Sequence, residues 1–273
     1  MVKVNDCEFG NELFFNGETV YKEVDLNDDL NTIEVEFTDD SDITKIMFAV
    51  QYIRDKKTRS KIVLKMLYIP YSRMDREIPE GKQLFSLKYF ANIINSMYFD
   101  KVVVLDPHSK ISVDLIENLW ILRVDRFIRA AVDNFKADYL FYPDKGAYSK
   151  YPELISREIK LPYFYGTKKR DLANNGKLLE DEYKLHDVPD IKGKRVLIVD
   201  DLVSRGGTAY LAARTLKENG ANKVGLCVAH CENGIFSGKL LEPEENGEYT
   251  VDKVYTAGTT PLDARHENLI IIK

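Results

Sequence analysis

Two adjacent acids, Asp200 and Asp201, follow the apolar run VLIV at 196–199 and precede a short turn with two glycines. The residues after this turn, AYLAARTLKENG at 209–220, have the spacing of apolar residues that is typical of a helix. Residues 204–208 would then lie at the amino end of that helix, where free N–H groups and the helix dipole attract anions. Carboxylates would repel a phosphate, so the two acids suit a group with hydroxyls, such as a ribose.

Two interpretations of this junction are open on its residues alone. In one, Ser204 or Thr208 caps the helix and the acids are solvated. In the other, the turn binds a phosphate, and Gly206 and Gly207 allow its backbone to approach the ligand closely. The chain has no GxxxxGK[ST] sequence and no GxGxxG after a strand, which excludes Walker-type and dinucleotide-binding loops.

The composition is that of a soluble globular protein with 273 residues, of which 44% are hydrophobic and 30% are charged. A net charge of -5 argues against nucleic acid or a membrane surface as a partner, but it allows a small anionic ligand. Without a signal-like segment, a membrane span or a disulfide framework, we expect a cytoplasmic protein. Cys227, His230 and Cys231 have metal-like spacing but no fourth ligand, so core packing is favoured over a zinc site.

Strands and helices alternate along the chain, which predicts parallel α/β layers. In the first half, we expect strands at 32–37, 61–70 and 101–107 and helices at 42–57 and 86–99. The second half repeats this order, with strands at 137–143, 195–201 and 223–230. Each half has an apolar strand that leads acids into a loop, as in KVVVLDPHS and RVLIVDDLVS. We therefore predict two related α/β domains, residues 1–138 and 139–273.

Several segments, in the same order along nearly the whole chain, resemble the ribose-phosphate pyrophosphokinases (PRPP synthases). VLIVDDLVSRGGT at 196–208 is similar to the ribose 5-phosphate loop that they share with type I phosphoribosyltransferases. The segments that separate the two groups are FFNGET at 14–19, YIPYSRMDRE at 68–77, LDPHS at 105–109, YPDKG at 142–146, FYGTKKRD at 164–171, GANKVGLCVAHCENGIFSG at 220–238 and VYTAGTTP at 254–261. The resemblance implies two tandem phosphoribosyltransferase-like domains, each a mostly parallel sheet flanked by helices. The short chain looks like the divergent members known in bacteriophages, in a bacterial or phage-infected host cytoplasm.

The resemblance also implies an activity, the transfer of the β,γ-diphosphoryl group of ATP to the anomeric hydroxyl of ribose 5-phosphate, with Mg²⁺ as cofactor. The residues that would bind the ribose phosphate are Asp200, Asp201, Ser204, Arg205, Gly206, Gly207 and Thr208. Those that would bind ATP are Phe14, Asn16, Glu18, Arg73, Asp75, Arg76 and His108, with His108 and Asp144 at the metal. Lys168 and Arg170 would stabilise charge on the transferring group, although Lys169 is an alternative for the lysine. A homo-oligomer, a dimer or larger, is expected.

By residue type alone, some of these segments have ordinary interpretations. The run KKR at 168–170 could be a solvated basic stretch, and RMDRE at 73–77 a surface cluster of ion pairs. His108 could be a polar residue at the end of a strand. The order of the segments along the chain favours the catalytic interpretation.

The chain departs from the family pattern at several positions. Met74 replaces a usual glutamine, Arg205 replaces a small residue of the phosphate loop, and AHC at 229–231 replaces THG. DPHSK at 106–110 replaces DLHxxQ, and the sequence stops at LIIIK, without the family's terminal helix.

The departures near the acceptor site keep a second substrate hypothesis open. The acceptor could be the terminal ribose of ADP-ribose, with Arg205 contacting a diphosphate. A non-catalytic regulatory relative is disfavoured because the acids and loop cations are retained. An ordinary phosphoribosyltransferase would leave the RMDRE and DPHS segments of the first half unexplained.

Overall fold

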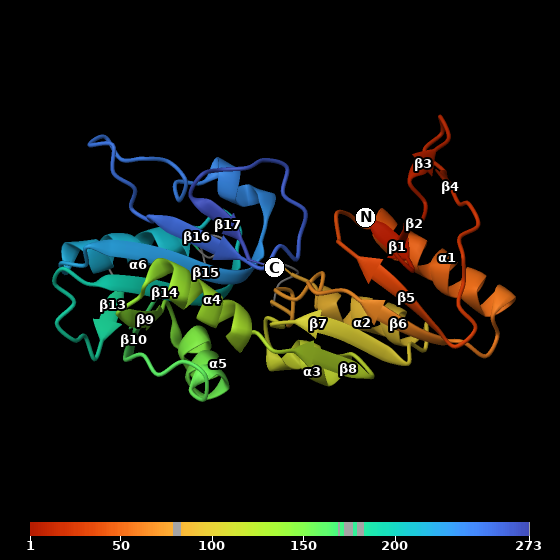
Figure 1. Cartoon of the computed structure of the whole chain (residues 1–273), viewed down its shortest axis with the longest axis horizontal. Coiled ribbons are helices and arrows are strands. Elements are labelled where there is room, and N and C mark those ends of the chain that lie inside the picture. The colour runs from red at the N-terminus through yellow and green to blue at the C-terminus, as the bar shows by residue number, and fades with distance from the viewer. Residues whose placement is uncertain (79–82, 169, 172–176, 179–182, 273) are drawn as a thin grey trace. The chain divides into compact units, whose positions relative to one another are not determined.

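The computed structural model describes residues 1–272 apart from 79–82, 169, 172–176 and 179–182, and only the backbone of 170, 171, 177 and 178. The chain forms two compact units, Met1–Leu122 and Arg123–Lys273 (Figure 1). This division lies before the expected boundary at 138/139, because α4 (Asp125–Phe135) packs on the sheet of the second unit. The apolar face of α4 includes Phe135, which lies against Gly225 in that sheet.

The first unit contains a six-stranded sheet in the order β2-β1-β5-β6-β7-β8. Its parallel strands are β5 (Leu30–Val35), β6 (Lys61–Lys65), β7 (Lys101–Leu105) and β8 (Leu119–Leu122), while β1 (Val2–Val4) and β2 (Cys7–Glu8) are antiparallel. The helices are α1 (Ser41–Lys56), α2 (Ser86–Asn95) and α3 (Lys110–Leu115). A small hairpin pairs β3 (Glu12–Leu13) with β4 (Thr19–Val20). The alternation predicted for this half is confirmed, and β8 is an additional strand.

The second unit contains a seven-stranded sheet in the order β13-β10-β9-β14-β15-β16-β17. The strands are β9 (Tyr139–Tyr142), β10 (Tyr163–Thr167), β13 (Lys184–His186), β14 (Arg195–Val203), β15 (Lys223–Cys231), β16 (Lys253–Thr256) and β17 (Leu269–Ile271). All neighbours pair in parallel except β13, which is antiparallel to β10. Helices α5 (Lys145–Ile155) and α6 (Gly207–Glu218) and the short 3₁₀ helix η3 (Asn233–Ser237) follow β9, β14 and β15, respectively. Two short strands, β11 (Arg170–Asp171) and β12 (Lys177–Leu178), pair with each other.

None of the helices in the described part of the chain has the length and apolar content needed to span a bilayer. Each unit has its own apolar core. In the first, the core lies between the sheet and residues such as Ile46 of α1 and Phe90 of α2. In the second, Leu216 of α6 packs with Ile198 and Leu226 of the sheet.

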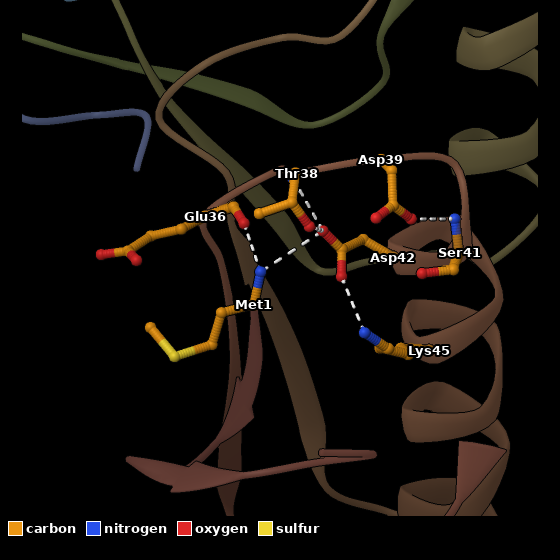
Figure 2. Close-up of polar contacts among 7 residues, drawn as sticks. All are labelled: Met1, Glu36, Thr38, Asp39, Ser41, Asp42 and Lys45. Atoms are coloured by element: carbon orange, nitrogen blue, oxygen red, sulfur yellow. Dashed lines mark hydrogen bonds and ion pairs between the residues drawn. The ribbon is translucent and has the colours of Figure 1, made fainter. Parts of the chain in front are cut away.

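Asp42, in the first turn of α1, is a charged residue whose side chain is fully buried in the first unit. Its Oδ2 accepts hydrogen bonds from the Thr38 backbone N–H at 2.8 Å and the Thr38 hydroxyl at 2.7 Å (Figure 2). The Met1 ammonium lies 3.3 Å from Oδ2, and Lys45 Nζ lies 3.2 Å from Oδ1. Burial alone would raise the pKa of Asp42, but these donors and positive charges outweigh it and hold the pKa below its ordinary value. The network ties β1 to the start of α1.

Replacing Asp42 with asparagine should lower the free energy of unfolding by about 2 kcal/mol at neutral pH, because hydrogen bonds to a charged group are lost. The folded-state pKa lies below the unfolded one, so this stabilisation is complete above the unfolded pKa and disappears as pH falls through the folded value. Urea unfolding of the wild type and Asp42→Asn across the acid range measures the difference. Asp39→Asn is the matched control, because Asp39 is exposed and an asparagine can still accept from the Ser41 N–H. Equal losses in the two variants would contradict this account of Asp42.

Candidate active site

The carboxyl ends of β9 and β14 meet where the strand order of the second unit reverses. On one side, β9 pairs with β10, the strand that follows it along the chain. On the other side, β9 pairs with β14, and β15 follows next to β14. Open parallel sheets bind ligands at such a switch point, just beyond the ends of the strands. Asp144 follows β9, Lys168 follows β10, and Asp200 and Asp201 lie near the end of β14. The topology therefore brings four of the predicted site residues to one edge of the sheet.

An ion pair joins the ends of β9 and β10. Lys168 Nζ lies 2.6 Å from Asp144 Oδ2 and also donates to Thr208 Oγ1 of α6 at 3.4 Å. The other carboxylate oxygen of Asp144, Oδ1, accepts from the Ala147 N–H at 3.0 Å and so caps α5. Burial would raise the pKa of Asp144, but the Lys168 charge and these hydrogen bonds hold it below its ordinary value. Lys168 thus connects three elements of the candidate site.

The other basic residues of this segment are less fully described. Lys169, the alternative to Lys168, lies outside the described residues, and so does the side chain of Arg170, whose backbone belongs to β11. The assignment of the loop lysine to Lys168 is supported by its contacts with Asp144 and Thr208. The predicted role of Arg170 stays a prediction.

Of the two acids of β14, Asp200 lies close enough to Asp144 for their charges to interact. Asp201 is buried, with 9% of its surface exposed, and its backbone N–H donates to Asp200 Oδ1 at 3.0 Å. Burial raises the pKa of Asp200 well above its ordinary value, and the charges of Asp201 and Asp144 raise it further against the opposing effect of Lys168. A carboxyl group in this environment gains from hydroxyl donors. The hydroxyls of a bound sugar would supply such donors.

The turn after β14 depends on Gly206. This residue is the N-cap of α6 and has φ +79°, a conformation that favours glycine. A Cβ on Gly206 would also lie 2.0 Å from Leu240 Cδ1. Within the described ranges, no side-chain hydrogen bond caps the amino end of α6, so Ser204 and Thr208 are not its capping residues. The space beside the Cα of Gly207 is open, as close approach by a ligand requires.

The segment that follows β15 packs closely on this turn. A Cβ on Gly238 would lie 2.0 Å from the Arg205 carbonyl oxygen, and one on Gly234 would lie 2.9 Å from Ser204 Oγ. The two glycines, both within GANKVGLCVAHCENGIFSG, therefore allow η3 and its flanks to support the turn. The side chain of Arg205 itself is exposed.

Gly206→Ala should lower the free energy of unfolding by about 2 kcal/mol, because alanine is strained at this φ and its Cβ would displace Leu240. Gly207→Ala is the matched control, since its φ is ordinary and no atom lies near a new Cβ. Its stability should be unchanged or up to about 1 kcal/mol higher. Thermal and urea unfolding of both variants measure the contrast. A Gly206→Ala protein as stable as Gly207→Ala would show that the turn tolerates another conformation.

In the first unit, the structure brings the 73–76 and 106–109 segments together. Arg76 Nε lies 2.8 Å from Asp75 Oδ1, and the Asp75 side chain is buried. Burial would raise the pKa of Asp75, but Arg76, Ser109 and His108 hold it below its ordinary value. Arg73, Arg76 and His108 are exposed. The first unit thus places Arg76 and His108 beside a buried acid.

Phe14, Asn16 and Glu18 lie on the β3–β4 hairpin, away from that cluster in the sequence. The Asn16 side-chain amide donates to Glu18 Oε2 at 2.9 Å, and its oxygen accepts from the Glu18 N–H. Phe14 is 60% exposed and the neighbouring Phe15 is fully exposed. An apolar tip of this kind is available for contact with a ligand or a second chain.

Among the described residues, no group of three or more His, Cys, Asp or Glu side chains is arranged to hold a metal ion. Cys227 and Cys231 are buried in β15, where burial raises the pKa of Cys231 to about 12. His230 Nδ1 lies 2.7 Å from Thr259 Oγ1. The expectation of core packing for this cluster is confirmed. Of the two predicted metal residues, His108 belongs to the first unit and Asp144 to the second.

The sequence interpretation missed one residue of this edge, Tyr183. It is buried, and its hydroxyl donates to the Pro143 carbonyl at 3.0 Å. Burial and the nearby charges of Asp144 and Asp200 raise its pKa, so it stays a neutral donor. The signal in the sequence was weak, a single aromatic residue between a charged stretch and β13.

The fold and this edge of the sheet define a phosphoribosyltransferase-type α/β protein, and the family model of the phosphoribosyl transferase domain matches residues 113–262. Over 269 residues, the chain is 28% identical to a ribose-phosphate pyrophosphokinase of Saccharolobus solfataricus, covering 96% of this chain and 87% of the relative. It is 30% identical to that of Pyrococcus furiosus over 206 residues, 74% of this chain and 67% of the relative. The chain belongs to the ribose-phosphate pyrophosphokinase family and is a transferase of the ribose-phosphate diphosphokinase type.

A solved structure supports the same fold. The phosphoribosylpyrophosphate synthetase of Mycobacterium smegmatis matches 96% of this chain and 84% of its own length with a TM-score of 0.69 and 20% identity. The predicted fold class, two tandem phosphoribosyltransferase-like α/β domains, is confirmed.

Proposed function

We propose that this protein transfers the β,γ-diphosphoryl group of ATP to the anomeric hydroxyl of ribose 5-phosphate, giving phosphoribosyl pyrophosphate and AMP. The observation that carries the proposal is the position of Lys168, whose ammonium lies between Asp144 and Thr208 at the edge that holds Asp200 and Asp201. Relatives named ribose-phosphate pyrophosphokinase support the same reaction.

The acceptor would bind at the end of β14. Asp200 and Asp201 accept hydrogen bonds from the ribose hydroxyls, because a carboxylate has several acceptor positions and a sugar hydroxyl is a donor. The 5-phosphate lies at the open amino end of α6, where residues 204–208 offer backbone N–H groups and hydroxyls. The acids and the turn together hold the anomeric hydroxyl in one position, which removes much of the entropic cost of an in-line displacement.

Lys168 would stabilise the charge of the transferring group. The anomeric oxygen forms a bond to the β-phosphorus while the bond from this phosphorus to the oxygen of the leaving AMP breaks, and the hydroxyl proton is released. Negative charge accumulates on the transferring oxygens, and a fixed ammonium in a partly buried site stabilises it strongly. We assign Arg170 a parallel role from its place two residues further along the chain.

Mg²⁺ is the proposed cofactor. Mg²⁺ in nucleotide sites is usually held by one or two carboxylates together with the phosphates of the substrate, so a few side chains would suffice. Asp144 offers a carboxylate at the site, and His108 an imidazole beside Asp75. The ion would neutralise phosphate charge during transfer.

We also propose that two or more copies associate. The first unit exposes Phe14 and Phe15 at its hairpin and Trp120 and Ile121 on the edge strand β8. Exposed apolar residues in such numbers favour an interface with another chain.

Lys168→Ala should reduce kcat for AMP formation by about 10²–10³-fold, because a charge aimed at the transferring group is lost. The matched control is Lys223→Ala, since Lys223 Nζ also lies 2.6 Å from a carboxylate oxygen, that of Asp252, but at the start of β15. AMP release with ATP, Mg²⁺ and ribose 5-phosphate is the measurement, with thermal unfolding to check the fold. Full turnover by Lys168→Ala would remove this residue from the mechanism.

A second acceptor, the terminal ribose of ADP-ribose, is favoured by one observation. Arg205 is exposed in the phosphate turn, and within the described part of the chain no hydrogen bond or ion pair holds its guanidinium. A guanidinium at this position suits the diphosphate of a larger acceptor, which it can bind with two parallel hydrogen bonds.

An acceptor panel distinguishes the two substrates. With ribose 5-phosphate as the acceptor, AMP release should proceed, and Arg205→Ala should change its KM by only a few fold. AMP release with ADP-ribose but not with ribose 5-phosphate would overturn the main proposal. In that case Arg205→Ala should raise the KM for ADP-ribose by about tenfold or more, because a charge-assisted contact is lost.

A further inference from the structure

We propose that Tyr183 is a positioning residue that fixes the peptide between Pro143 and Asp144, and thereby the carboxylate that holds Lys168. The inference rests on the proposed function, since it assigns a residue to the same site. Tyr183 does not contact the reacting groups in this account. It acts through Asp144.

The contact that carries the inference is a buried hydrogen bond between segments far apart in the sequence. The Tyr183 hydroxyl donates to the Pro143 carbonyl at 3.0 Å, and the ring belongs to the same apolar cluster as Phe141 and Phe164. The Pro143 carbonyl and the Asp144 N–H belong to one rigid peptide plane. Holding the carbonyl therefore fixes the direction in which the chain enters Asp144.

Asp144 has little freedom to adjust by itself. One carboxylate oxygen accepts from the Ala147 N–H at 3.0 Å, and the other lies 2.6 Å from Lys168 Nζ. A rotation of the backbone at Asp144 would lengthen one of these contacts. The ion pair with Lys168 thus depends on the orientation of the Pro143–Asp144 peptide.

Strand β10, which leads to Lys168, passes close to the same hydroxyl at Gly166. A Cβ on Gly166, two residues before Lys168, would lie 2.5 Å from Tyr183 Oη and 3.0 Å from Phe141 Cζ. Any other residue would therefore push the phenol away from Pro143. Register supports this arrangement, since Thr167 of β10 pairs with Lys184 of β13, the residue after Tyr183. One phenol thus lies between the strand that leads to Lys168 and the turn that leads to Asp144.

Tyr183→Phe tests the role of the hydroxyl while keeping the ring. We expect kcat for AMP formation to fall about tenfold, while the KM for the acceptor changes less than about twofold, because the acceptor turn at 204–208 is untouched. Tyr255→Phe is the matched control, since its buried hydroxyl donates to Asn134 Oδ1 at 2.8 Å at a distance from this edge. It should lose similar stability and keep its kcat. Equal kcat values in the two variants would overturn the proposal.

A second measurement does not depend on activity. Hydrogen exchange at the Ala147 amide reports whether the Asp144 carboxylate still caps α5. Exchange should accelerate in Tyr183→Phe and not in Tyr255→Phe; unchanged protection of Ala147 in both would overturn the positioning role. If the wild type releases no AMP with any acceptor, the proposed function fails, and this measurement still decides the role of Tyr183.

The contact with Gly166 allows a double-mutant test. Gly166→Ala alone should lower kcat, because the new methyl group displaces the phenol. In the Tyr183→Phe background the same change should cost clearly less, since the hydroxyl nearest to the methyl is gone. Fully additive effects on kcat would contradict a shared role of the two residues.

Discussion

Three carboxyl groups lie at one edge of the second sheet, and the ion pair between Lys168 and Asp144 partly offsets the repulsion among them. Asp144, Asp200 and Asp201 lie near one another in partly or fully buried positions. Lys168 contacts Asp144 directly and lowers its pKa, but its charge only partly offsets the effects that raise the pKa of Asp200. Hydroxyl donors and positive charge would therefore stabilise the ionised form of Asp200, and the ribose and the metal-bound nucleotide of the proposed reaction would supply them.

Two helices, α5 and α6, begin at this edge, and their amino ends differ in how they are capped. At α5, the Asp144 side chain accepts from Ala147 and so occupies the helix end with a charge of the chain itself. At α6, the N-cap is Gly206, and no side chain of the described residues caps the free N–H groups. Of these two helices, α6 is the one whose amino end the described residues leave uncapped, and Lys168 contacts both Thr208 of α6 and Asp144, the N-cap of α5. The local sequences PDKG and SRGGT are thus responsible for the difference between the two ends.

Much of this edge could be predicted from the sequence because it depends on short segments. An apolar strand, two acids, a glycine turn and a helix follow one another within 195–218, and chain order alone places them together. Tyr183 could not be predicted in this way, since its bond to Pro143 joins positions 40 residues apart and depends on the pairing of β10 with β13. The strand β8 was missed because LWIL is short and follows a helical pattern, and its start is set by Asn118 at φ +54°. The unit boundary depends likewise on tertiary packing, that of α4.

In the turn at 204–208, the backbone is held by neighbouring residues, whereas the side chain of Arg205 is exposed. Gly234, Gly238 and Leu240 pack against the backbone at 204–206, so the path of the turn is fixed from outside it. The Arg205 side chain is exposed, so its replacement does not require the turn to change. The backbone path of the turn therefore does not depend on which side chain position 205 carries. The proposal that Arg205 influences the choice of acceptor rests on this difference between a supported backbone and an exposed side chain.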